Sequence, residues 1–130
     1  MIENAIIAID FDGTVVTHDY PEIGKDIGAI PILKMLAETN YLILYTMRSG
    51  KELKDAIDWF KNNDIQLYGI QTNPTQKEWT DSPKCYANVY IDDAALGAPL
   101  VYGMHNRPYI DWDKVREILE NYDTEFVLIK

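Results

Sequence analysis

The chain has 130 residues, of which 47% are hydrophobic and 25% are charged, which is the balance of one soluble globular domain. Its formal net charge of −9 repels polyanions, and no run of Lys or Arg offsets that charge, so nucleic acid is not an expected partner. No apolar stretch approaches the roughly 20 residues that cross a bilayer, and the N-terminus lacks a signal-peptide pattern. We therefore predict a single cytoplasmic domain over residues 1–130 with no membrane partner.

Three short apolar runs predict strands that are buried on both faces, at residues 6–9, 41–45 and 87–91. Each run is followed or ended by a polar residue: Asp10, Thr46 or Asp92. In open parallel α/β sheets, ligands bind beyond the carboxyl ends of the strands, so these three residues are expected to share one site. Weaker strand candidates lie at 66–70, 100–102 and 125–129.

Helical patterns fill the intervals between the strands. Residues 50–63 have apolar side chains at helical spacing, and Ser49 with Glu52 has the spacing of a capping box. A second helix has Pro31 in its first turn and ends near residue 40, and a third begins after an Asp111 cap. The third helix is expected to bury Val115, Ile118, Leu119 and Tyr122. Alternating strands and helices predict an α/β fold with a doubly wound, mostly parallel, Rossmann-like sheet in three layers, α/β/α.

The segment after the first strand reads Asp-Phe-Asp-Gly over residues 10–13. On an extended chain Asp10 and Asp12 point the same way, so two carboxylates share one side of the strand end. Such crowding requires a cation or a proton to relieve the repulsion. Taken alone, the pattern fits a catalytic site, a calcium loop or a plain turn.

The order of four features along the chain resembles the haloacid dehalogenase (HAD) superfamily of hydrolases. Residues 10–15, Asp-Phe-Asp-Gly-Thr-Val, are similar to the first signature of that superfamily, and Thr46 matches the second. Lys84 matches the third signature, and the pair Asp92 and Asp93 matches the fourth. The resemblance covers nearly the whole chain, which is similar to small uncharacterised HAD-like hydrolases of bacteria and phages.

This resemblance implies a phosphatase that works through an aspartyl-phosphate. Asp10 would be the nucleophile, and Asp12 the general acid and base that protonates the leaving oxygen and then deprotonates water. Thr46 would donate a hydrogen bond to the transferred phosphoryl group, and Lys84 would offset its charge and orient Asp10. A carboxyl group at position 12 favours phosphatase or phosphomutase chemistry over that of transport ATPases.

The resemblance also implies Mg²⁺ as cofactor. One oxygen of Asp10, the backbone carbonyl of Asp12 and the carboxylate of Asp92 would hold the ion, since Mg²⁺ prefers oxygen ligands in octahedral geometry. Asp93 would bind it through water or orient Lys84.

The intervals between the signatures hold a small loop over residues 17–28, which we call the flap, but no cap domain. A capless site is open, so the resemblance implies a large substrate, closure by a homo-oligomer or loose selectivity for small phosphorylated molecules. Candidates for substrate contact are Gly13, Thr14, Met47 and Arg48, although an exposed salt bridge is an equal alternative for Arg48.

Two other classes of function stay open. A receiver-like signalling module also combines an acidic pair, a phosphorylated Asp, a Thr or Ser and a Lys, but in a different order along the chain. A degenerate HAD-fold binding protein would keep the fold without turnover. His18 and His105 have no neighbours at metal-ligand spacing and are expected to be solvated, and the three tryptophans are expected to be packing residues.

Overall fold

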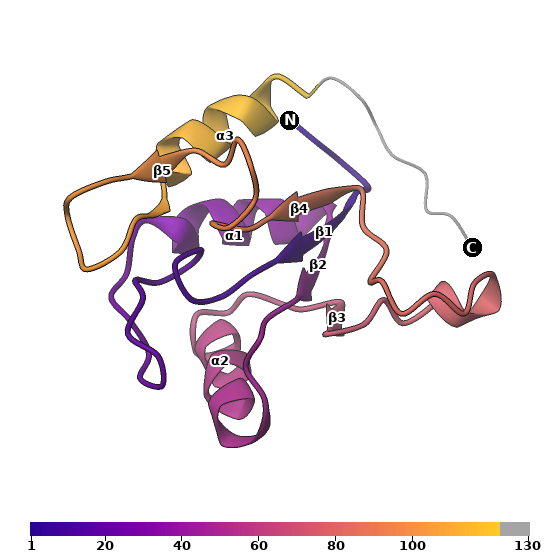
Figure 1. Ribbon diagram of the computed structural model, residues 1–130. Helices are drawn as coiled ribbons and strands as arrows, with labels where there is room; N and C mark the ends of the chain where they lie inside the picture. Colours follow the sequence, from indigo (N-terminus) through magenta and orange to yellow (C-terminus); the bar gives the residue numbers. More distant parts are fainter. Residues whose placement is uncertain (123–130) are drawn as a thin grey trace.

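The computed structural model describes residues 1–122, so the strand expected at 125–129 lies outside the described residues. Four parallel strands form the main sheet in the order β3-β2-β1-β4 (Figure 1). The strands are β1 (Ile6–Ile9), β2 (Tyr41–Leu44), β3 (Gly69–Ile70) and β4 (Val89–Ile91). The predicted α/β fold with a parallel, Rossmann-like sheet is confirmed.

The register of the sheet aligns the ends of its three longest strands. Ile9 at the end of β1 pairs with Leu44 of β2 on one side and with Ile91 of β4 on the other. The chain therefore leaves all three strands at the same edge. The parallel pairing thus accounts for the expected meeting of polar residues from distant parts of the chain.

The three α-helices of the described residues contribute to one face of the sheet. They are α1 (Ala29–Thr39), α2 (Gly50–Asn62) and α3 (Trp112–Glu120). Their buried side chains form one core with Ile7 and Ile9, whereas Ile6 and Ala8 belong to a separate cluster. Because successive side chains of a strand point to opposite faces, the two clusters lie on opposite sides of the sheet.

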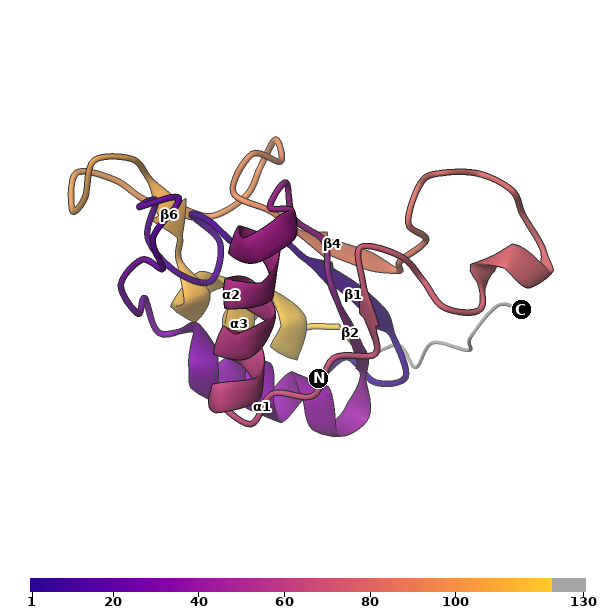
Figure 2. The same ribbon diagram turned by 90° about the horizontal axis from the view of Figure 1, so that it is seen from below.

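The second face is covered by the connection from β3 to β4, residues 71–88, which holds the 3-10 helix η1 (Gln76–Glu78). In Figure 2 the strands lie between the helices and this segment. Buried Gln76 holds the segment together: it donates to the carbonyls of Ser82 and Lys84 and accepts from the amide of Tyr86. Within residues 1–122, an irregular segment thus takes the place of the α-helix expected on this face.

The helices begin and end close to the predicted positions. Asp111 caps α3 by accepting a hydrogen bond from the amide of Lys114. Ser49 precedes α2 but makes no side-chain capping bond, so the capping box is not formed. The predicted burial of Ile118 is wrong, since 49% of it is exposed, and buried Trp112 packs at the start of the helix instead. Tyr122 lies beyond the helix with 36% exposed.

A small antiparallel sheet lies outside the parallel one. The strand expected near residue 100 is β5 (Leu100–Val101), and it pairs with β6 (Tyr109–Ile110), which was not predicted. The amide of Ile110 donates to the carbonyl of Gly13, so this hairpin attaches to the loop that follows β1. Within the described part of the chain, no helix combines the length and the apolar character needed to cross a membrane.

Candidate active site

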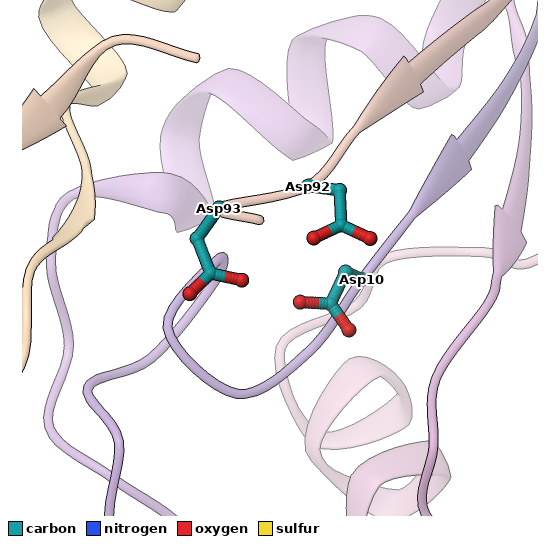
Figure 3. Close-up of side chains that lie close together, drawn as sticks. All are labelled: Asp10, Asp92 and Asp93. Carbon is teal, nitrogen blue, oxygen red and sulfur yellow. The ribbon is translucent and has the colours of Figure 1, made fainter. Parts of the chain in front are cut away.

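Three carboxylates meet at the carboxyl edge of the sheet. Asp10 follows β1, and Asp92 with Asp93 follows β4, which is hydrogen-bonded to β1. Each contributes one oxygen to a group whose members all lie within 4.8 Å of one another. Figure 3 shows the side chains of Asp10 and Asp92 directed toward the same space, with Asp93 beside them. Among residues 1–122 this is the one cluster of three His, Cys, Asp or Glu side chains with metal-ligand spacing.

Thr14 links two residues of this cluster through hydrogen bonds. Its hydroxyl donates to Oδ2 of Asp10 at 2.8 Å and accepts from the backbone amide of Asp93 at 3.0 Å. The residue is fully buried, and the indole Nε1 of Trp112 donates to its backbone carbonyl at 2.7 Å. Thr14 therefore joins the two strand ends, and its buried side chain is not the substrate contact that the sequence had suggested.

The electrostatics of the cluster favour a bound cation or proton. Burial, together with the negative charge of Asp92, raises the pKa of Asp10 to about 8, even though the hydrogen bond from Thr14 lowers it. The protein alone therefore does not stabilise the negative charge of Asp10 at this edge. An ion with oxygen preference would restore the charged form of Asp10.

Both histidines form contacts within the protein, contrary to the prediction that both are solvated. Nε2 of His18 lies 2.7 Å from Oδ2 of Asp93, and both side chains are only 12% exposed. His105 lies 3.0 Å from Asp19 of the flap, and Asn106 donates to the carbonyl of His18. The flap is therefore joined both to the acidic cluster and to the loop between β5 and β6.

Thr46 lies in the loop after β2, next to the end of β1. Gln71 fixes its backbone from both sides, because Oε1 accepts from the Thr46 amide at 2.8 Å and Nε2 donates to the Thr46 carbonyl at 2.7 Å. The Thr46 hydroxyl accepts from the amide of Arg48, and within residues 1–122 it donates to no protein group. Its proton is thus available to a ligand, as the prediction for this residue requires.

The side chain of Asp12 forms an ion pair with Arg48. Arg48 donates to both of its carboxylate oxygens, through Nε at 2.9 Å and Nη2 at 2.8 Å. The Arg48 side chain is only 1% exposed, so neither predicted role, substrate clamp or exposed salt bridge, describes it. The sequence had not predicted that Asp12 and Arg48 form a pair.

Lys84 lies apart from the carboxylates. Its side chain is exposed, and Nζ is 5.4 Å from the centre of the Tyr90 ring. In the described part of the chain, no hydrogen bond or ion pair joins it to Asp10. The structure therefore brings together Asp10, Asp92, Asp93 and the flanking Thr46, but not Lys84.

Among the other predicted contacts, Gly13 uses both of its backbone polar groups within the protein, and Met47 projects from the loop with 97% exposure. Sequence reasoning missed the roles of Gln71 and His18. Each carries a polar side chain in a segment without periodicity, so no local pattern distinguished it from a solvated loop residue.

The fold and the site together define an α/β protein with a parallel sheet and a carboxylate cluster at its carboxyl edge. A solved structure of a conserved protein from Bacteroides thetaiotaomicron is similar to it, with 33% sequence identity over 93% of each chain and a TM-score of 0.75. The chain belongs to the same family as that conserved Bacteroides protein. No protein-family model and no curated protein matches the chain.

Proposed function

We propose that this protein is a capless, Mg²⁺-dependent phosphatase of the HAD superfamily, with Asp10 as the nucleophile. The observation that carries the proposal is the meeting of Asp10 with Asp92 and Asp93 within 4.8 Å at one sheet edge. Independent turns or caps would give no reason for these carboxylates, far apart in the sequence, to converge. A phosphate site that recruits a cation explains their convergence.

The residues present fit a magnesium ion. The carboxylates of Asp10 and Asp92 and the backbone carbonyl of Asp12 would hold it, with Asp93 acting through water, and all four donors are the hard oxygens that Mg²⁺ prefers. Burial raises the pKa of Asp10 to about 8, and a bound cation would favour its ionised form. When bound, the ion would offset the repulsion between a phosphate dianion and the nucleophile.

The protein's own residues would carry the two halves of the reaction. A carboxylate oxygen of Asp10 bonds to phosphorus, the bond to the leaving oxygen breaks, and Asp12 gives its proton to that oxygen. Water then attacks the aspartyl-phosphate and gives a proton to Asp12, and the bond between phosphorus and Asp10 breaks. Inorganic phosphate leaves and Asp10 is again a carboxylate.

Two further groups would stabilise the transferred phosphoryl group. The Thr46 hydroxyl, whose proton no protein acceptor takes within residues 1–122, would donate to a phosphoryl oxygen. Lys84 would supply positive charge, and to do so it must leave the ring of Tyr90. An exposed cation–π contact contributes about 0.5–1 kcal/mol, which is less than a charge-assisted hydrogen bond to phosphate contributes. The bond to phosphate would therefore offset the loss of the contact with Tyr90.

The site is proposed to be open, because within residues 1–122 the flap is the one insertion between β1 and α1 and no cap domain follows it. Met47, next to Thr46, is 97% exposed and would contact the organic part of a small phosphorylated substrate. A homo-oligomer that covers the open edge is part of the same proposal. Sedimentation would test it, since a purely monomeric protein would leave the edge uncovered.

Hydrolysis of 4-nitrophenyl phosphate with Mg²⁺ and with EDTA tests the function. We expect turnover only with Mg²⁺, and a loss of at least about a thousandfold in Asp10→Asn. Asp58→Asn, which alters an exposed carboxylate paired with Lys54 on α2, is the matched control and should retain full activity. Equal rates for wild type and Asp10→Asn would remove Asp10 from the mechanism. A phosphorylated protein that persists for many minutes would instead favour a signalling module.

A further inference from the structure

Arg48 is a fully buried arginine in the loop between β2 and α2. An arginine is seldom fully buried unless its charge is paired and its donors are satisfied. In this protein the guanidinium uses all five of its N–H groups, in five hydrogen bonds to protein oxygens. It has no donor left for a substrate phosphate.

Two of these bonds form a fork on Asp12. Nε donates to Oδ2 and Nη2 donates to Oδ1, at 2.9 and 2.8 Å, so both carboxylate oxygens are fixed in one plane. A bidentate guanidinium pair of this kind is both strong and directional. Each oxygen keeps a second lone pair that can accept another proton.

The remaining three bonds attach two other segments to the same guanidinium. Nη1 donates to the carbonyls of Pro21 and Glu52, both at 3.2 Å, and Nη2 donates to the carbonyl of Glu22 at 2.8 Å. The guanidinium carbon also lies 4.9 Å from the ring centre of Phe11 and 5.2 Å from that of Tyr20. Arg48 therefore joins the flap, the start of α2 and the segment that carries Asp12.

We propose that Arg48 is a positioning residue that aims Asp12 as the proton acceptor for the dephosphorylation step, and that it couples this aim to the docked flap. The proposal rests on the proposed function. Arg48 touches neither the substrate nor the reacting atoms, and it acts through Asp12. In the step it serves, water bonds to phosphorus, its proton passes to Asp12, and the bond from phosphorus to Asp10 breaks to release inorganic phosphate.

The test measures how much of the enzyme carries phosphate during turnover. Arg48→Met is expected to lower kcat at least about tenfold and to change KM by no more than about twofold. The reason is that a misoriented Asp12 slows hydrolysis of the aspartyl-phosphate and does not affect substrate binding. Intact-protein mass spectrometry should then find a larger fraction of the enzyme phosphorylated, as in Asp12→Asn. Deuterium exchange of the amides of residues 17–28 should be faster. Arg48→Lys should restore the charge but not the fork, and so recover only part of kcat.

Lys51→Met is the matched control, because Lys51 lies three residues further along, has a side chain that is 77% exposed and forms an ion pair with Asp55. It should change neither the phosphorylated fraction nor flap exchange. The double variant Arg48→Met with Asp12→Asn removes the buried charge together with its partner, so it tests the coupling even if Arg48→Met folds poorly. Its kcat should equal that of Asp12→Asn alone.

The outcomes separate the two proposals. A wild-type protein without Mg²⁺-dependent hydrolysis overturns the proposed function and, with it, the role of Arg48. An active wild type whose phosphorylated fraction does not rise in Arg48→Met overturns the Arg48 proposal alone. Additive losses in the double variant would also overturn it, because residues that act as one unit are not additive.

Discussion

The acidic cluster predicts that Asp10→Asn stabilises the metal-free protein while it abolishes phosphatase activity. Asparagine has nearly the same shape as aspartate, and its carbonyl oxygen can still accept the hydrogen bond from Thr14. The substitution removes one negative charge from a half-buried group of three carboxylates. A residue that lowers stability for the sake of a ligand is expected at a binding site.

The size and the pH dependence of this effect follow from the pKa of Asp10, which burial raises from 3.8 to about 8. In the folded protein Asp10 keeps its proton up to about pH 8, whereas in the unfolded chain it loses the proton near pH 4. Wild-type stability therefore falls as pH rises from about 4 to about 8, because the folded state binds the extra proton. At 1.4 kcal/mol per pH unit the ceiling is about 6 kcal/mol. We expect about half of it, because part of the side chain is in contact with solvent.

Urea unfolding in EDTA at pH 4, 6, 7 and 9 would measure the effect. The free energies of unfolding of wild type and Asp10→Asn should agree near pH 4 and separate by about 3 kcal/mol at pH 9. Adding Mg²⁺ at pH 7 should stabilise the wild type, since a ligand that binds only the folded state adds stability, and should leave Asp10→Asn unchanged. Asp58→Asn, on the exposed face of α2, controls for the loss of an ordinary surface charge.

A stability difference that does not vary with pH would refute this reasoning, because the titration of Asp10 would then not be its source. A less stable Asp10→Asn at pH 9 would show that the three carboxylates are compensated within the protein. Stabilisation of Asp10→Asn by Mg²⁺ equal to that of wild type would show that the ion binds elsewhere.

Two predictions concern the loop that supports the cluster. Gly13→Ala should destabilise the protein by at least about 3 kcal/mol, because Gly13 has a positive φ of 78° and an added Cβ would collide with the ring of His18. Gly97→Ala, with φ of 88° and open space around it, should cost only about 1–2 kcal/mol; thermal unfolding compares the pair, and equal losses would contradict the packing argument. Trp112→Phe should cost about 1–3 kcal/mol in urea unfolding, because it leaves the buried carbonyl of Thr14 without its donor; no loss would mean that water replaces the indole.

Local sequence was sufficient to predict the three longest strands of the parallel sheet and the polar residues that follow them. An apolar run that is buried on both faces can only lie inside a covered sheet, and parallel strands bring their carboxyl ends to one edge. The positions of Asp10, Asp92 and Thr46 at those ends follow directly. The helices were also predictable, because their apolar side chains recur at helical spacing and Asp111 offers a cap.

Pairs between distant loop residues were not predictable in the same way. Arg48 and Asp12 are separated by 36 positions, and His18 and Asp93 by 75. A charged or polar side chain in a loop has many potential partners, and only the tertiary fold selects one of them by placing it within hydrogen-bond distance. The same holds for Gln76. Its three hydrogen bonds hold together the irregular segment that covers the second face of the sheet.

The sequence alone therefore determined which carboxylates lie at the edge of the sheet, since backbone pairing and burial follow from short apolar patterns. The tertiary structure decided how those carboxylates are held and which side chains pair with their neighbours. It paired Asp12 with buried Arg48, whereas sequence order had associated the acidic residues with Lys84. The physical reason is that burial of a charge requires a partner in three dimensions, and that requirement leaves no periodic pattern in the sequence.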